Sequence, residues 1–142
     1  MRRRVSAVQT LSRDELLAHA RIARSAAYAP YSKFAVGAAV ETQDGEIVTG
    51  CNVENASYGL SICAERVALV HAIALGHRSF RAIAVAGPDG IETSPCGACR
   101  QFIAEFDPAM PITYCGVDGP VHTTLALLLP RSFGPHSLPH PG

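Results

Sequence analysis

The sequence predicts an α/β fold, a three-layer α-β-α sandwich around one mixed five-stranded sheet. Helix-like and strand-like segments follow one another in the order α-β-β-α-β-α-β-β-α. Helices that alternate with strands through the middle of a chain favour one sheet covered on both faces. The 142 residues suffice for one core, and no repeat or linker divides them. We therefore expect one domain, 1–142, with an ordered core over about 11–135.

The first helix is indicated by its capping residues. Ser12 can cap a helix, and Glu15, three residues later, completes a capping box. We expect this helix to reach about Tyr28, because the residue before a proline disfavours helix and Pro30 follows closely.

The later elements are short apolar segments between turn residues. An Asp-Gly pair at 44–45 joins two strand-like runs, which is typical of a β-hairpin. An alanine- and valine-rich segment that ends at Gly76 predicts a helix. In chain order, we expect strands at 34–41 and 47–53, a helix at 63–75, a strand at 80–86, a helix at 96–106, strands at 112–117 and 121–123, and a brief helix at 124–129. A proline-rich tail is expected to lose order after Gly134.

The overall composition is globular and without a dominant charge. Hydrophobic residues make up 48% and charged residues 17%, and twelve basic residues balance twelve acidic ones. Phosphate backbones are bound by a basic face, so this balance argues against a nucleic-acid partner. No apolar run approaches the roughly 18 residues of a membrane span, and no secretory signal pattern opens the chain. We expect a cytoplasmic protein without a membrane partner.

Three cysteines carry the main functional signal. Cys63 opens one predicted helix, and Cys96 and Cys99 open another. Free backbone N–H groups at helix N-termini stabilise thiolates. Zinc prefers four tetrahedral ligands, so three protein ligands leave one position for water, as in catalytic sites. We expect one Zn²⁺ per chain. A distant fourth ligand stays open as an alternative, although Cys51 and Cys115 fit buried small hydrophobes.

Two charged residues follow Cys63. Glu65 is a candidate acid and base, because a carboxylate beside an activated water can move its proton to a leaving group. The alternative for Glu65 is a first-turn residue that suits the helix dipole. Arg66 lies three residues after Cys63, on the same helical face, and can donate to the sulfurs. We expect Arg66 to offset the negative charge of three thiolates around zinc; the alternative is a surface arginine.

These residues resemble a known pattern. Cys63-Ala64-Glu65 with Pro95-Cys96-Gly97-Ala98-Cys99 is similar to the zinc nucleoside deaminases, with Cys63 in the place of a histidine. Stretches 31–39, 52–59, 94–101 and 128–135 resemble the small homotetrameric cytidine deaminases of the cytidine/deoxycytidylate deaminase family. The resemblance implies a cytidine deaminase-like fold. It also implies hydrolytic deamination of cytidine and deoxycytidine to uridine and deoxyuridine in pyrimidine salvage, with Glu65 moving protons to N3 and to the departing amine.

The resemblance also implies how a nucleoside substrate is bound. Phe34 offers a flat face to the pyrimidine, and the Ala64 backbone N–H reaches the base carbonyl. Asn52 and Glu54 alternate along a predicted strand, so both side chains point to one side and can hold the ribose hydroxyls. The implied substrate-binding set is Phe34, Asn52, Glu54, Ala56, Tyr58, Ala64 and Phe133. In the family, Tyr58 and Phe133 reach into neighbouring subunits, which implies a homotetramer with shared active sites.

Three other functions are alternatives to this one. A related deaminase could act on a cytosine-like nucleoside antibiotic of the blasticidin S type. A polynucleotide-editing deaminase is disfavoured by the neutral charge and the few aromatic residues. A non-catalytic, zinc-stabilised module predicts a closed four-ligand site and indifference to Glu65.

Overall fold

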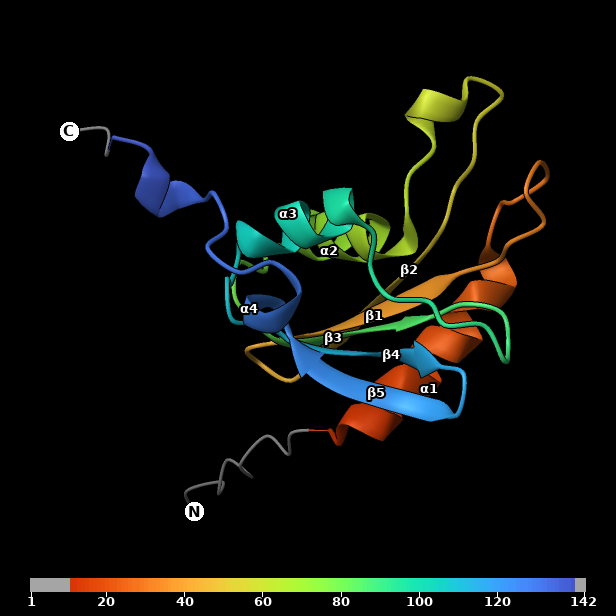
Figure 1. Cartoon of the computed structure of the whole chain (residues 1–142), viewed down its shortest axis with the longest axis horizontal. Coiled ribbons are helices and arrows are strands. Elements are labelled where there is room, and N and C mark those ends of the chain that lie inside the picture. The colour runs from red at the N-terminus through yellow and green to blue at the C-terminus, as the bar shows by residue number, and fades with distance from the viewer. Residues whose placement is uncertain (1–10, 140–142) are drawn as a thin grey trace, which may run out of the picture.

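The chain forms one mixed sheet of five strands in the spatial order β2-β1-β3-β4-β5 (Figure 1). The structure is a computed structural model that describes residues 11–139, so residues 1–10 and 140–142 of the expected domain lie outside it. Neighbouring strands are antiparallel except for β3 and β4, which run parallel and are joined through a helix. The strands are β1 (Gly37–Thr42), β2 (Ile47–Cys51), β3 (Phe80–Ala86), β4 (Pro111–Gly116) and β5 (Gly119–Thr124).

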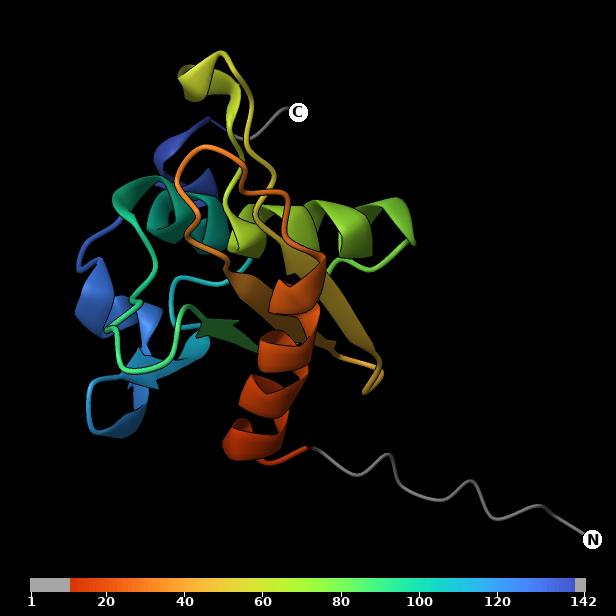
Figure 2. The same ribbon diagram turned by 90° about the vertical axis from the view of Figure 1, so that its right-hand side faces the viewer.

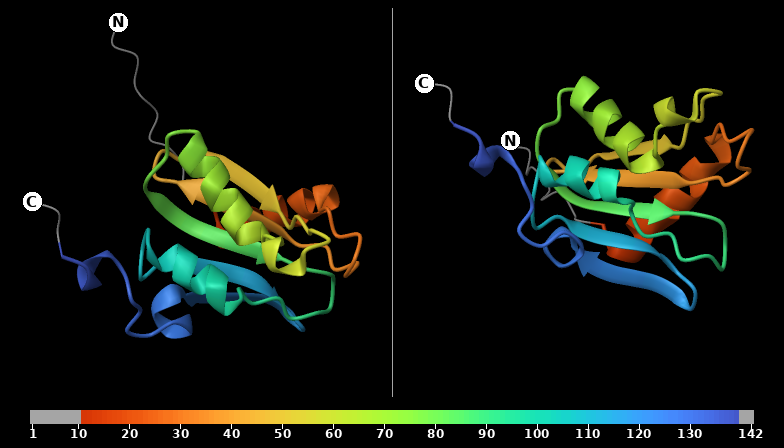
Figure 3. Two further views of the ribbon diagram at one scale, coloured as in Figure 1. Left: turned by 90° about the horizontal axis from the view of Figure 1, so that it is seen from above. Right: turned by 45° about the horizontal axis from the view of Figure 1, so that its top comes forward.

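Helices cover both faces of this sheet, as the sequence predicts. The first helix, α1 (Arg13–Ala23), lies on one face, and α2 (Ala64–Ala74) and α3 (Gly97–Ala104) lie side by side on the other (Figure 3). The short α4 (Leu125–Leu128) follows β5 and packs against α3. The expected three-layer sandwich is therefore confirmed. None of the helices within residues 11–139 has the length and apolar character needed to cross a membrane.

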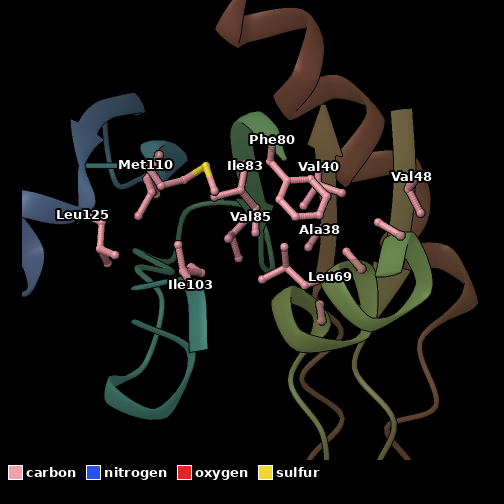
Figure 4. Close-up of a cluster of buried hydrophobic side chains, with 14 of the residues drawn as sticks. Ala38, Val40, Val48, Leu69, Phe80, Ile83, Val85, Ile103, Met110 and Leu125 are labelled. Atoms are coloured by element: carbon pink, nitrogen blue, oxygen red, sulfur yellow. The ribbon is translucent and has the colours of Figure 1, made fainter. Parts of the chain in front are cut away.

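The core consists of two clusters, one on each face of the sheet. Alternate residues of a strand point to opposite faces, so neighbours such as Ala38 and Ala39 belong to different clusters. The larger cluster lies under α2 and α3, where Leu69 and Ile103 meet the side chains of β3 (Figure 4). The smaller cluster lies under α1 and includes Leu16 and Leu17 of that helix.

Two glycines allow the helices to approach the sheet closely. A Cβ atom on Gly37 would lie 2.0 Å from the carbonyl oxygen of Ala20 in α1. A Cβ atom on Gly50 would lie 2.4 Å from the backbone nitrogen of Ala68 in α2. Only glycine fits such contacts between two backbones. Gly50 therefore sets the distance between β2 and α2, and with it the place of the α2 N-terminus.

The predicted end of the first helix was wrong. Helix α1 ends at Ala23 and continues only as the 3-10 helix η1 (Arg24–Ala26). The backbone of Tyr28 pairs instead with a neighbouring loop, because its N–H donates to Asn52 at 2.9 Å and its carbonyl accepts from Glu54 at 2.8 Å. Tertiary pairing has thus replaced helical hydrogen bonds at Tyr28.

The other boundaries agree with the predicted segments within three residues. Two short helices were not among the predicted elements. The loop that carries the 3-10 helix η2 (Tyr58–Leu60) extends beyond α2, next to the loop that follows α1 (Figure 2). The tail forms a further 3-10 helix, η3 (Pro135–Ser137), so a defined turn continues beyond the expected limit at Gly134.

Candidate active site

Three cysteines meet where the N-termini of α2 and α3 lie next to each other. Cys63 is the N-cap of α2, Cys96 is the N-cap of α3, and Cys99 lies in the first turn of α3. Their sulfur atoms all lie within 4.8 Å of one another. The backbone N–H of Cys99 donates to Cys96 Sγ at 3.4 Å, so a free N–H group of the helix terminus points at a ligand sulfur.

The geometry of this cluster fits a zinc ion. Two sulfurs bound to one tetrahedral zinc at about 2.3 Å lie about 3.8 Å apart. The Sγ atoms of Cys63 and Cys96 lie 3.8 Å apart. Soft thiolate donors in a tetrahedral arrangement favour zinc over magnesium or calcium. The three cysteines can therefore hold one zinc ion.

The cluster leaves one coordination position free of protein ligands. Within the described range 11–139, no other His, Cys, Asp or Glu side chain joins it. Cys115 lies in the small core cluster under α1, as expected for a buried hydrophobe, and Cys51 is half-buried at the end of β2. Three protein ligands and one open position are typical of catalytic zinc sites.

Arg66 lies beside the sulfurs, as its spacing predicts. Its Nη2 donates to Cys63 Sγ at 3.6 Å. A hydrogen bond to Cys63 is the largest cause that raises the pKa of Arg66; burial opposes it, and a hydrogen bond to Cys99 raises the pKa further. The guanidinium is therefore a fixed positive charge next to the thiolate cluster.

The thiols of the cluster differ in acidity. A hydrogen bond with Cys99, supported by bonds with Arg66 and Cys96, lowers the pKa of Cys63 to about 5 against the effect of burial. The bond to Cys63, together with burial, raises the pKa of Cys99. Cys63 thus loses its proton more readily than Cys99, and the Cys99 thiol must lose its proton when zinc binds.

Glu65 is a buried acid next to the cysteines. It is the second residue of α2, and only 3% of its surface is exposed. Burial raises the pKa of its carboxyl group, and hydrogen bonds with its own backbone and with Cys99 oppose this effect in part. Glu65 does not belong to the ligand cluster. Its carboxyl group therefore lies beside the cluster without being one of its ligands.

A cavity of about 340 Å³ opens next to the cysteines. It collects side chains from the loop before β1, the loop after β2, the start of α2 and the loop before α3. The lining residues are Ser32, Phe34, Val36, Asn52, Glu54, Cys63, Ala64, Glu65, Thr93, Ser94 and Cys96. A concave site of this size with a few convergent polar groups suits a small molecule.

Asn52 reaches this cavity from a loop, so the predicted strand position was wrong. Strand β2 ends at Cys51, and the chain beyond it forms single bridges from Val53 to other loops. The Asn52 side chain accepts a hydrogen bond from the N–H of Val36 at 2.9 Å and donates to the carbonyl of Phe34 at 2.7 Å. Asn52 therefore fixes the segment that carries Phe34.

Glu54 borders the same cavity, also from the loop after β2. Its Oε1 accepts hydrogen bonds from the N–H groups of Tyr31 at 3.0 Å and Ser32 at 3.1 Å, and the Ser32 hydroxyl donates to Oε2. The bond from the Ser32 hydroxyl, followed by the backbone bonds, lowers the pKa of Glu54. The carboxylate is therefore ionised and fixed in place.

Three residues of the predicted substrate-binding set do not line this cavity in a single chain. Ala56 is exposed, and Tyr58 and Phe133 are 73% and 60% exposed. Tyr58 borders an adjoining cavity of about 340 Å³, where its ring meets that of Tyr31 edge-on at 5.7 Å. The contact of these three residues with substrate stays a prediction, and it involves a second chain for Tyr58 and Phe133.

Four lining residues were not predicted to contact a ligand. They are Ser32, Val36, Thr93 and Ser94. Ser32 and Ser94 belong to the stretches that resemble deaminases, but hydroxyl residues in loops show no spacing that would single them out. The position of Ser94 two residues before Cys96 was the available signal.

Comparisons with known proteins agree with this geometry. The family model described as the cytidine and deoxycytidylate deaminase zinc-binding region matches residues 11–115. A cytidine deaminase from Sporosarcina psychrophila is 47% identical over 127 residues, which cover 88% of this chain and 93% of the relative. A cytidine deaminase from Mycobacterium tuberculosis is 43% identical over 118 residues, which cover 82% and 86%.

Solved structures show the same likeness. The crystal structure of cytidine deaminase from Burkholderia pseudomallei is similar to this chain with a TM-score of 0.81 at 46% identity, covering 87% of this chain and 100% of that one. The crystal structure from Mycobacterium tuberculosis gives a TM-score of 0.77 at 40% identity, covering 87% and 98%. By its matched region and these relatives, the chain belongs to the cytidine and deoxycytidylate deaminase family.

Proposed function

We propose that the chain catalyses the hydrolytic deamination of cytidine and deoxycytidine, giving uridine or deoxyuridine and ammonia. The site is built within one domain over about 11–135. Cys63, Cys96 and Cys99 hold one zinc ion, and Glu65 moves the protons. A cytoplasmic location suits this chemistry, because a reducing compartment keeps the five free cysteines as thiols.

The burial of Glu65 beside the cysteines is the observation that carries this proposal. A structural zinc site has no use for a buried carboxyl group that is not a ligand. Burial is unfavourable for the ionised form of a carboxyl group, and it raises the pKa of Glu65. Such groups are concentrated at functional sites, because an acid with a raised pKa exchanges protons readily near neutral pH.

The reaction divides its work between the metal and this acid. Bound zinc supplies a Lewis acid that brings the pKa of a water molecule toward roughly 7. Glu65 takes a proton from this water as its oxygen bonds to C4 of the cytosine ring. Glu65 delivers this proton to N3, which makes C4 more electrophilic. It then takes the second proton of the water from the new hydroxyl group on C4 and delivers it to the amine as the C4–N bond breaks. The products are the uracil nucleoside and ammonia, so all atoms of water are accounted for.

Other residues of the cavity orient the nucleoside. The ring of Phe34 stacks on the pyrimidine, and the backbone N–H of Ala64, at the N-terminus of α2, donates to the base carbonyl. The fixed carboxylate of Glu54 accepts hydrogen bonds from ribose hydroxyls. Oε1 of Glu54 already accepts two hydrogen bonds, whereas Oε2 and each polar group of Asn52 keep capacity for one more, so both residues can hold ribose while they fix the protein backbone.

The enzyme acts as a homotetramer in which neighbouring chains complete each site. Two exposed aromatic side chains support this assembly. Tyr58 is 73% exposed and Phe133 is 60% exposed, and large apolar groups on a surface are typical of interfaces. Mixing two inactive variants, Glu65→Gln and Phe133→Ala, tests the shared site after the subunits exchange. Sites that combine both intact residues regain activity if Phe133 serves a neighbour. Activity that stays at the level of the separate variants contradicts sharing.

The two alternative functions have less support. The relatives reported above are cytidine deaminases, which does not support a deaminase specific for an antibiotic. A non-catalytic zinc module requires a fourth protein ligand, and none joins the cluster within the described residues.

The direct test follows the ultraviolet absorbance of cytidine and the release of ammonia with zinc-loaded protein. The expected result is loss of the cytidine absorbance with one ammonia per nucleoside. Removal of the metal with a chelator stops the reaction, and added zinc restores it. Zinc-loaded protein that leaves cytidine unchanged overturns the proposal. Faster turnover of blasticidin S than of cytidine would favour the antibiotic alternative.

A further inference from the structure

We propose that Arg100 is a positioning residue for the metal site, because it holds the loop that carries Cys96 against α4. The proposal rests on zinc binding by the cysteine cluster. Arg100 follows Cys99 in α3 and is half-buried. Its Nε donates to the carbonyl oxygen of Pro95 at 2.7 Å, and its Nη1 donates to the carbonyl oxygen of Leu128 at 2.9 Å.

The bond to Pro95 acts directly on a metal ligand. The carbonyl of Pro95 belongs to the peptide unit whose nitrogen is that of Cys96, so this hydrogen bond fixes the plane from which the Cys96 side chain departs. Cys96 itself is exposed, whereas Cys99 is buried within α3. Packing therefore holds Cys99, but Cys96 depends on its backbone for its position.

The bond to Leu128 provides the anchor. Leu128 is the last residue of α4, where carbonyl groups lack partners within the helix. Helices α3 and α4 lie next to each other (Figure 3). The next residue of α3, Gln101, donates to the carbonyl of Phe133 at 2.8 Å, so this part of α3 is tied to the C-terminal segment twice.

The loop before Cys96 is braced from its other end as well. The N–H of Thr93 donates to the carbonyl of Cys115 in β4 at 2.9 Å. Residues 93–96 are therefore held at both ends: Thr93 is bonded to β4, and Arg100 links Pro95 to α4. Without the guanidinium, two carbonyl groups lose their donor and the Cys96 sulfur is free to shift relative to the other ligands.

Arginine is required here for its shape. Its planar guanidinium presents donors in a fixed fork, and two of them serve acceptors on different elements. Lysine keeps the charge but concentrates its donors on one flexible ammonium group, so it does not replace the fork. If only the charge of Arg100 mattered, Arg100→Lys would bind zinc like the wild type. If Arg100 positions the loop, Arg100→Lys should bind zinc more weakly.

The test compares zinc-loaded Arg100→Lys with wild type and with a matched control, Arg78→Lys. Nη1 of Arg78 also donates to two backbone carbonyls, those of Ile73 at 2.9 Å and His77 at 2.8 Å, at the end of α2 remote from Cys63. Two readouts apart from activity are used. One is zinc affinity in competition with a chromophoric chelator, and the other is the thiolate charge-transfer spectrum of the Co²⁺-substituted protein.

We expect Arg100→Lys to bind zinc about 10- to 100-fold more weakly, as for other residues that orient metal ligands, and to change the Co²⁺ spectrum. Arg78→Lys is expected to keep both properties. Unchanged affinity and spectrum in Arg100→Lys overturn the inference, even if its melting temperature falls, and so does an equal loss in Arg78→Lys. Wild-type protein that binds no zinc overturns the proposed function as well. If Arg100→Met also folds, it should show the larger defect.

Discussion

Arg66 donates a hydrogen bond from Nη2 to the Sγ atom of Cys63 at 3.6 Å, across the first turn of α2. This contact places a permanent positive charge against the cysteine cluster. Without this charge, Zn²⁺ and three thiolates would form a site with a net charge of −1, and the zinc would be a weaker Lewis acid. Because the charge comes from the same helix as the ligand, a short segment of sequence specifies both.

Replacing Arg66 is expected to separate metal binding from turnover. Arg66→Gln keeps a polar group near the sulfurs but loses the charge, so zinc content measured by atomic absorption should stay near one per chain. Turnover of cytidine should fall about 10- to 100-fold. Arg78→Gln serves as the control, because Arg78 follows the C-terminal end of α2, remote from Cys63. Full activity in Arg66→Gln would show that the charge has no role.

Asn52 is expected to matter for stability as well as for substrate. Its side chain satisfies the backbone groups of Phe34 and Val36, so Asn52→Ala leaves a donor and an acceptor without partners. The free energy of unfolding should fall by about 1–3 kcal/mol, and the KM for cytidine should rise. Urea titration and initial rates measure the two effects. A variant with raised KM and unchanged stability would mean that Asn52 contacts only the ribose.

The lowered pKa of Glu54 predicts that the protein loses stability as the pH falls. The bonds from Ser32 and Tyr31 lower the pKa of Glu54 in the folded state. The stabilisation by these bonds is therefore fully present above the unfolded-state pKa and is lost as pH falls through the lower, folded-state pKa. The melting temperature of wild type should exceed that of Glu54→Gln near neutral pH, and the difference should shrink in acid. A difference that is constant from neutral to acid pH contradicts this assignment.

The contact between Gly50 and α2 predicts a steric effect. A Cβ atom at Gly50 would lie 2.4 Å from the backbone nitrogen of Ala68, so Gly50→Ala must push α2 away from β2. We expect a loss of about 1–3 kcal/mol in the free energy of unfolding, with weaker zinc binding. At Gly59 a Cβ atom would meet nothing within 4 Å, so Gly59→Ala should stay within about 0.5 kcal/mol of wild type. Equal stability of the two variants would refute the close approach.

Short-range patterns made most of the fold and the metal cluster predictable. Cys63, Cys96 and Cys99 lie at helix N-termini that local sequence signals locate, and the strand 80–86 was predicted with its observed bounds. Tyr28 was misplaced because a residue distant in sequence, Asn52, supplies its backbone partner. No local pattern reports such pairing.

The rest of the site depends on similar distant contacts. The hydrogen bonds of Asn52 to the segment around Phe34 arise only when two loops fold together. Arg100 had no spacing signal, because its acceptors are backbone carbonyls that no residue type marks. The predicted contact of Phe133 with substrate requires a second chain, and the fold of one chain does not specify such a contact.

The most direct measurement of the central claim is the turnover of cytidine by zinc-loaded Glu65→Gln. Losing one acid and base typically costs about 10²–10⁴ in rate, and we expect a loss beyond this range because two proton transfers depend on Glu65. Zinc content and melting temperature should stay close to those of wild type, and Glu92→Gln, an exposed loop variant, should keep full activity. Near-normal turnover in Glu65→Gln with zinc bound would contradict the account.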